Sequence, residues 1–166
     1  MQKIKIKGQM IKSFTIDHTK LQPGVYVSRV DNIGKEYITT YDLRVCTPNK
    51  ESLTPEISHT IEHLMADYLR NNWIYKKEVV YFGPMGCMTG FYLILKGKSD
   101  IVRIACGLID ALESCSRAII IPGETEKECG NYRLNNLNGA RETLKKYKEE
   151  IESIISEASL LFSYPQ

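Results

Sequence analysis

The spacing of apolar residues changes between two periods along this chain, and this change constrains the fold more than any other feature. Residues 24–45 and 76–97 each read as two strands around a turn, and residues 41–46 alternate apolar side chains with polar ones, which is typical of a strand. Apolar residues repeat at helical spacing in residues 55–71, 99–118 and 138–162. Because hairpins alternate with helices, the sequence predicts a single α+β domain, with an antiparallel sheet packed on one face by helices.

The ends of these elements carry local signals. Thr54 can cap the first helix, and Pro55 then occupies the first helical position, where a missing N–H costs nothing. We further expect a turn at residues 32–34, a glycine-rich turn at residues 83–90, Ser99 as the cap of the second helix, and a short buried strand in "AIIIPG", residues 118–123.

Charge and length exclude several classes of function. The 166 residues carry 22 Lys and Arg against 20 Asp and Glu, and this net charge of +2 predicts no general affinity for nucleic acid or membrane. No apolar run approaches the ~20 residues of a membrane span. Five cysteines without a secretory signal indicate reduced thiols in the cytoplasm. Basic residues cluster in residues 1–12, which we expect to be an N-terminal arm on a domain of residues 13–166.

The first predicted helix carries two histidines and a glutamate on the face opposite its apolar residues. His59 and His63 are four residues apart, and two imidazoles so placed can hold one metal ion. Glu62 lies about 60° around the helix from them, where it can reach a metal-bound water or a substrate without being a ligand. Such a face indicates a cleft covered by another part of the chain or by a second copy. The alternative is a pair of surface histidines, since HxxxH alone is a weak motif.

Two histidines leave a metal site incomplete, and the cysteines are candidates for the third ligand. Cys106 and Cys115, on the second helix, are predicted to be buried and inert, and Cys46 lies on a strand. Cys87 in "GPMGCMTG" and Cys129 in "EKECGNY" lie beside glycines in loops, where reactive groups tend to sit. One of these two could bind the metal while the other serves as an acid–base or nucleophilic thiol, and spacing does not distinguish them.

The second strand of the first hairpin places Asp42 and Arg44 on the face opposite Tyr41 and Leu43. Pattern alone favours a solvated sheet face for this charged pair, because functional residues are rare among surface charges.

Five segments resemble, in order, the signature blocks of one known family. They are "SFTIDH", "YDLRVCTPNK", "SHTIEHLMADYLRN", "PMGCMTGFY" and "EKECGNYRLNNLNGAR", and they extend from Ser13 to Arg141. The family is S-ribosylhomocysteine lyase, or LuxS, which makes the precursor of autoinducer-2. The motif HxxEH alone is weak, whereas five ordered blocks are a strong signal.

The resemblance implies a role for each matching residue. His59, His63 and Cys129 would bind one divalent metal per subunit, Fe²⁺ in the family, with water in the fourth position, and the same ligands also suit Zn²⁺ or Co²⁺. Glu62 and Cys87 would be the two acid–base groups. Four positions match residues of the substrate pocket: Arg44, Ser13, His18 and Phe14. The family is homodimeric with its sites at the subunit interface, which fits a helix face that needs a cover.

The family's reaction explains these residue types. Its small-molecule substrate, S-ribosylhomocysteine, joins a ribose to homocysteine by a thioether. The carbonyl moves from C1 to C2 to C3 through enediolates, and β-elimination then gives homocysteine and dihydroxypentanedione. Each step removes a proton from a carbon beside a carbonyl, so a Lewis-acidic metal and two acid–base groups are sufficient, without a redox cofactor.

Two positions before "PMGC" depart from the family, because Tyr81 and Gly83 stand where aspartate and serine are usual. All ligand and acid–base positions are retained, which favours an active enzyme. The alternatives are a non-catalytic metal-binding copy of the family and a metalloprotease of the inverted HxxEH type. A protease of that type takes a glutamate as third ligand and would leave Cys87 and Cys129 without a role.

Overall fold

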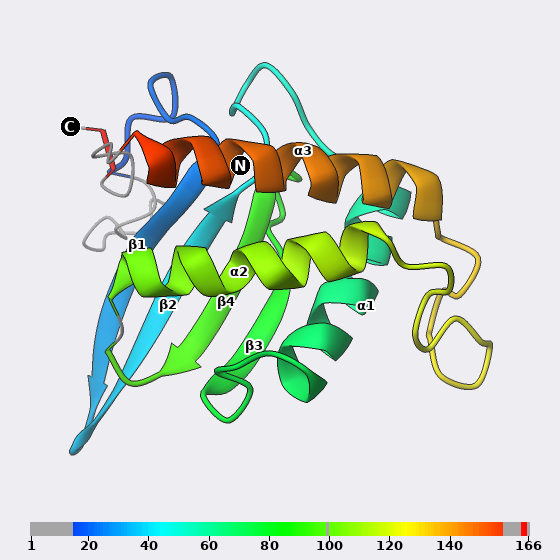
Figure 1. Cartoon of the computed structure of the whole chain (residues 1–166), viewed down its shortest axis with the longest axis horizontal. Helices are drawn as coiled ribbons and strands as arrows, with labels where there is room; N and C mark the ends of the chain where they lie inside the picture. Colours follow the sequence, from blue (N-terminus) through cyan, green and yellow to red (C-terminus); the bar gives the residue numbers. More distant parts are fainter. Residues whose placement is uncertain (1–14, 99, 158–163, 166) are drawn as a thin grey trace, which may run out of the picture.

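A four-stranded antiparallel sheet lies behind three helices in the described part of the chain (Figure 1). The structure is a computed structural model that describes residues 15–98, 100–157, 164 and 165. The elements follow in the order β1 (Gly24–Ile33), β2 (Glu36–Arg44), α1 (Pro55–Asn71), β3 (Val79–Pro84), β4 (Gly90–Lys96), α2 (Ile101–Ser116) and α3 (Leu137–Ser156). The strand order is β1-β2-β4-β3, and each neighbouring pair is antiparallel. The predicted α+β class is confirmed.

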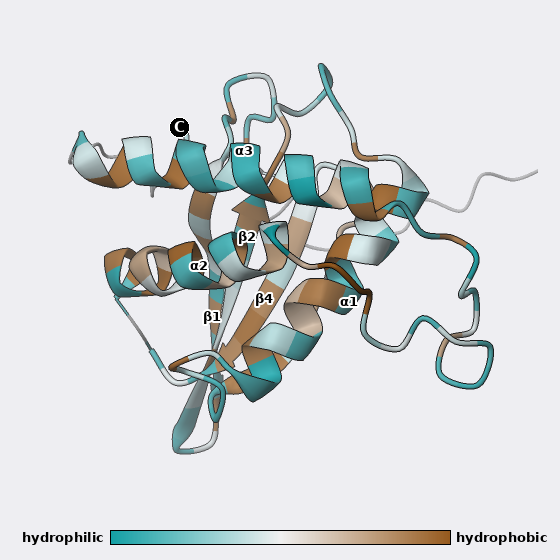
Figure 2. Ribbon diagram, turned by 45° about the vertical axis from the view of Figure 1, so that its right-hand side comes forward, coloured by the Kyte–Doolittle hydropathy of each residue, from teal (hydrophilic) through white to brown (hydrophobic). Residues whose placement is uncertain are grey.

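The sheet has two chemically different faces. The row that faces the helices crosses β1, β2 and β4 as Val25, Leu43 and Phe91. The adjacent row crosses the four strands as Tyr26, Asp42, Tyr92 and Gly83. Because successive strand residues point to opposite sides, the second row lies on the outer face of the sheet. In Figure 2, hydrophobic residues of α3 lie on its sheet side and hydrophilic residues on the opposite side.

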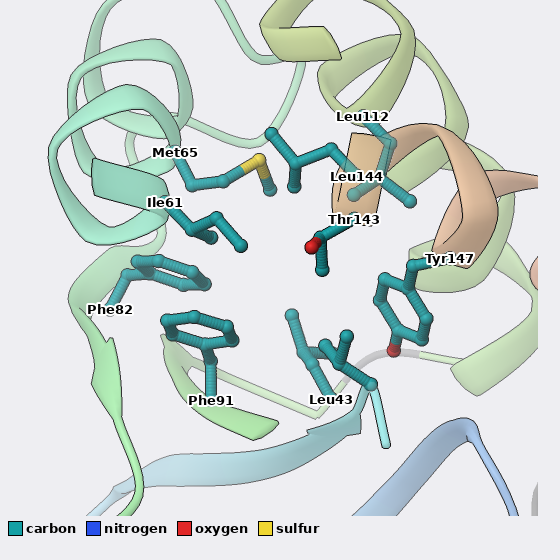
Figure 3. A pocket seen from close by; sticks show the side chains of 10 residues that line it. Leu43, Ile61, Met65, Phe82, Phe91, Leu112, Thr143, Leu144 and Tyr147 are labelled. Carbon is teal, nitrogen blue, oxygen red and sulfur yellow. The ribbon is translucent and has the colours of Figure 1, made fainter. Parts of the chain in front are cut away.

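A small apolar gap remains in the core between the sheet and the helices (Figure 3). Phe82 and Phe91 line it and stack with their ring centroids 5.1 Å apart. Tyr147 also lines it, but its hydroxyl donates a hydrogen bond of 2.7 Å to the carbonyl of Gly24. The gap is therefore a feature of core packing, because its surface is apolar and this hydroxyl is already bonded.

Helix α1 begins and ends at the predicted residues. The Thr54 side chain accepts a hydrogen bond from the backbone N–H of Ile57, and Pro55 occupies the first turn. Ile61 and Leu64 are buried in the core, and the helix packs against β3, α2 and α3. This packing fixes the opposite side of α1, which carries the two histidines.

Four local predictions are wrong, and three of them concern the ends of elements. Strand β1 continues through Ile33, which pairs with Glu36, so the turn comprises residues 34 and 35, and Gly34 takes the left-handed conformation at φ 66°. Strand β3 continues through Pro84, which shortens the glycine-rich turn to residues 85–89. Helix α2 is capped by Asp100, whose carboxylate accepts from the N–H groups of the first turn. Ser99 lies outside the described residues.

The fourth error concerns "AIIIPG". Residues 118–123 form no strand in the structure, and Ile119 and Ile120 are 84% and 72% exposed. Only Ile121 of the three isoleucines is buried. A run of apolar residues that is too short for a helix gives no periodicity by which to tell a buried strand from an exposed loop.

Among the helices that the structure describes, none has both the length and the apolar character needed to cross a membrane.

Candidate functional site

The structure brings His59, His63 and Cys129 together from two segments that are far apart in the sequence. The two imidazole Nε2 atoms are 3.2 Å apart, and Cys129 Sγ lies 3.4 Å and 3.6 Å from the Nε2 atoms of His59 and His63. α1 supplies the histidines, and the loop between α2 and α3, yellow in Figure 1, supplies the cysteine. Three ligand atoms that all lie within 4.8 Å of one another are the arrangement expected of a metal-binding group.

The other nitrogen of each imidazole faces an oxygen atom. His59 Nδ1 lies 2.8 Å from the carbonyl of Leu134, and His63 Nδ1 lies 2.7 Å from the carbonyl of Pro122. A carbonyl can only accept, so each Nδ1 carries the proton, and each Nε2 has a free lone pair directed at the other candidate ligands. Partners of this kind orient metal-binding histidines and set their tautomer. The residues therefore fit a metal ion.

Polar contacts hold the α2–α3 loop against α1. The Thr60 hydroxyl accepts from the backbone N–H of Asn136 at 2.8 Å, and the Asn135 side-chain oxygen lies 3.1 Å from His59 Nδ1. Gly123 takes the left-handed conformation at φ 69° beside the His63 ring, where a side chain would be strained. The loop is thus fixed at both of its contacts with the histidines.

Glu62 is half-buried and lines the same surface depression as the three candidate ligands. The N–H of Asn131 donates to Cys129 Sγ at 3.4 Å. An ion held by these two nitrogens and one sulfur would keep one position of a tetrahedral site for water or substrate, as in catalytic sites.

A second group of candidate residues gathers around Cys87 at the turn between β3 and β4. Arg44 Nη1 lies 3.8 Å from Cys87 Sγ and also donates to the Thr89 hydroxyl, which itself lies 3.1 Å from the sulfur. Arg44 Nη2 donates to Asp42 Oδ2 at 2.6 Å. The prediction of a solvated face is wrong for this pair, because Asp42 and Arg44 are only 1% and 3% exposed.

The surroundings of Cys87 favour its thiolate. Burial raises the pKa of the thiol, but the hydrogen bonds from Thr89 and the charge of Arg44 outweigh this effect. The pKa of Cys87 therefore lies below its ordinary value. A thiol of lowered pKa that is exposed at a turn can act as a base near neutral pH.

The structure places His18 with Cys87 rather than with the metal-binding group. His18, Cys87 and Thr89 line one depression, whereas Glu62 and the candidate ligands line the other. The two depressions share no lining residue. Ser13 and Phe14, which we expected in the substrate pocket, lie outside the described residues, as does the N-terminal arm.

The departures at Tyr81 and Gly83 are coupled in space. Both lie on the outer face of β3, and the phenol of Tyr81 occupies the space that a side chain at position 83 would need. Gly83 lies opposite Tyr92, which in turn lies opposite Asp42. The Tyr81 ring thus fits beside a glycine at position 83. It leaves no room in its present position for the serine expected there from the resemblance.

The remaining cysteines differ from one another in exposure. Cys115 is buried as predicted, and burial raises its pKa to about 12. Cys46 is also buried, just beyond the end of β2. The prediction is wrong for Cys106, which is exposed on α2. None of the five forms a disulfide, and each is a free thiol.

Sequence reasoning gave no role to several residues that hold these groups in place. Asn135 contacts His59, Thr89 contacts Cys87, and Asp42 anchors Arg44. The pattern of alternate strand residues did place Asp42 and Arg44 on one face, and that signal could have paired them. The carbonyls of Leu134 and Pro122 left no signal, because any residue supplies a carbonyl.

Together the fold and the site define an α+β protein with a His₂Cys group that could hold a metal ion. Comparisons with known proteins name the family. Residues 11–158 match the model of S-ribosylhomocysteinase (LuxS). The chain is 46% identical over 151 residues to S-ribosylhomocysteine lyase of Borreliella burgdorferi (strain ZS7), covering 89% of this chain and 95% of the relative. It is 47% identical over 161 residues to the same enzyme of Desulfotalea psychrophila, covering 95% and 99%. This chain belongs to the LuxS family.

Proposed function

We propose that this protein is a metal-dependent lyase that splits S-ribosylhomocysteine into homocysteine and dihydroxypentanedione, the precursor of autoinducer-2. The observation that carries the proposal is the convergence of His59, His63 and Cys129 beside Glu62, in a chain of this family. Inverted HxxEH proteases take a glutamate as third ligand, whereas here a cysteine from a distant loop meets the histidines.

The candidate ligands would hold one divalent ion per subunit. We assign Fe²⁺ on the resemblance to the family, and Zn²⁺ or Co²⁺ would suit the same nitrogen and sulfur atoms. When bound, such an ion supplies a Lewis acid that stabilises negative charge on sugar oxygens as protons leave the neighbouring carbons.

Glu62 and Cys87 would carry the protons. Each carbonyl shift takes a proton from the carbon beside the carbonyl and returns one to the former carbonyl carbon, so the sugar is rearranged without gain or loss of electrons. Once the carbonyl is at C3, removal of the proton from C4 expels the homocysteine sulfur from C5. Cys87 suits the role of base because its pKa is lowered, and Glu62 suits the second transfer because it lies beside the metal ligands.

The separation of the two groups supports a homodimer with shared sites. Glu62 and Cys87 line different depressions of one chain, so one substrate would reach both if a second copy placed its Cys87 group over the metal-binding group. Ile119 and Ile120 are exposed in the loop that leads to Pro122. Exposed apolar side chains beside a site are typical of a surface that another copy covers.

We place the enzyme in the cytoplasm, because its five cysteines are free and the proposed thiol chemistry requires them to be reduced.

The test is to load the anaerobically purified protein with Fe²⁺, add S-ribosylhomocysteine, and follow free thiol with a chromogenic disulfide. We expect one thiol released for each substrate consumed.

Glu62→Gln should keep the metal and lose roughly 10²- to 10⁴-fold in kcat, because an amide cannot exchange the proton. Cys87→Ala should also keep the metal and be inactive, whereas Cys129→Ala should lose the metal. A folded, metal-loaded protein that releases no thiol would contradict the proposal and favour a non-catalytic copy.

A further inference from the structure

A tyrosine near the C-terminus contacts the outer face of the sheet behind the Cys87 group. Tyr164 donates a hydrogen bond of 3.0 Å from its hydroxyl to Asp42 Oδ2. Its ring stacks on Tyr26, with centroids 5.0 Å apart and planes 7° from parallel. Tyr26 lies directly opposite Asp42 across β1 and β2, so the stacked ring and the hydrogen bond fix Tyr164 at one place on this face.

Asp42 connects this tyrosine to the arginine that faces the thiol. The same oxygen, Oδ2, accepts from both Tyr164 and Arg44 Nη2. The side chains of Asp42 and Arg44 are 2% and 4% exposed, so the pair is shielded from water. The other end of the guanidinium, Nη1, faces Cys87 Sγ at 3.8 Å. A continuous path therefore runs from the Tyr164 hydroxyl through Asp42 and Arg44 to the thiol.

The Tyr164 hydroxyl stabilises the ionised form of Asp42. Burial raises the pKa of Asp42, and Arg44 and the Tyr164 hydroxyl both act to lower it. A buried carboxylate is stable only when donors surround it, and loss of one donor increases its demand on the others. The other ionisable groups near Asp42 and Cys87 are His18, Tyr26, Tyr92, Tyr147, Lys50 and Glu51. Arg44 is the group that contacts both Asp42 and Cys87.

We propose that Tyr164 is a positioning residue for the Cys87 thiol, acting through Asp42 and Arg44. This inference rests on the proposed role of Cys87 as an acid–base group. The Tyr164 hydroxyl supplies one of the hydrogen bonds that Asp42 Oδ2 accepts. Arg44 therefore bonds Asp42 through Nη2 and keeps Nη1 directed at the sulfur. Tyr164 lies beyond residues 11–158, which match the family model.

The test is Tyr164→Phe, which keeps the ring on Tyr26 and removes only the hydroxyl. Two quantities are measured: the pH dependence of Cys87 alkylation by iodoacetamide, resolved by peptide mass spectrometry from the other four cysteines, and kcat and KM for S-ribosylhomocysteine. We expect the alkylation profile to move to higher pH and kcat at neutral pH to fall about threefold to tenfold, the worth of one hydrogen bond, with KM nearly unchanged.

The matched control is Tyr26→Phe. Tyr26 lies on the same face, but its hydroxyl donates to the carbonyl of Gln22 at 2.9 Å and not to Asp42, so this variant should keep the parental alkylation profile. An unchanged profile in Tyr164→Phe, a shift to lower pH, or an equal shift in both variants would overturn the inference. Alkylation does not require turnover, so a parental protein that releases no thiol would contradict the proposed function while this test still decides the role of Tyr164.

Discussion

At the scale of single residues, two cysteines that look alike in the sequence have different surroundings in the structure. Cys129 meets two imidazoles whose protons are held on the far nitrogens, whereas Cys87 meets a guanidinium and a threonine hydroxyl. The first environment suits a metal ligand, and the second suits a thiolate base. Spacing left open which of the two thiols binds the metal. Their neighbours favour Cys129 as the ligand and Cys87 as the base.

Thr89 should influence the reactivity of Cys87 without touching the metal-binding group. Thr89→Val keeps the shape of the side chain and removes the hydroxyl that favours the thiolate. Because the parental pKa is lowered, removing this cause should move the alkylation profile to higher pH and slow alkylation at neutral pH about twofold to tenfold. Site-resolved alkylation with iodoacetamide measures the effect. An alkylation rate equal to that of the parent would contradict the role given to the Thr89 hydroxyl.

Asn135 should influence the metal without touching the thiol. Its side-chain oxygen lies beside His59 Nδ1 and the Thr60 hydroxyl, so Asn135→Ala weakens the orientation of one imidazole. Loss of such a supporting contact typically lowers metal affinity about tenfold to hundredfold. Competition with a chromogenic chelator measures the affinity. Asn138→Ala, an exposed position on α3, is the control, and equal metal affinity in both variants would contradict the role given to Asn135.

At the scale of elements, strand β3 carries two positions, Tyr81 and Gly83, whose side-chain space overlaps. The Tyr81 phenol lies where a side chain at position 83 would be, so Gly83→Ala should push the ring away. In a Tyr81→Ala background the same substitution should be neutral or stabilising, because alanine suits a strand interior better than glycine. Urea unfolding of the four proteins gives the coupling, expected to be about 0.5–1.5 kcal/mol. Strictly additive free energies of unfolding would contradict this coupling.

The elements also show what a sequence can and cannot predict here. The bounds of α1 followed from Thr54, Pro55 and the apolar spacing, because the signals for its start and its buried face are local. The exposure of Ile119 and Ile120 and the burial of Asp42 and Arg44 could not be predicted that way. Those outcomes depend on which distant segments cover each face, and the covering residue Tyr164 is 122 residues from Asp42. Of the candidate ligands, Cys129 was chosen from the family blocks, because spacing indicated the two histidines and left Cys87 and Cys129 as alternatives for the third.

At the scale of the whole molecule, the proposed reaction depends on how two copies of the chain combine. One chain presents a metal-binding group and a thiol group in separate depressions, and the proposed reaction needs both on one substrate. Two copies of the chain related by a twofold axis can form two such sites, each with its metal from one subunit and its thiol from the other.

The most direct test mixes two inactive variants, Cys129→Ala, which should lack metal, and Cys87→Ala, which should lack the base. The subunits are dissociated, mixed in equal amounts, reassociated with Fe²⁺ and assayed for thiol release from S-ribosylhomocysteine. Random pairing makes half of the dimers mixed, and each mixed dimer has one intact site, so we expect about one quarter of the parental activity. If mixed dimers form but release no thiol, each site is built within one subunit and the account is contradicted.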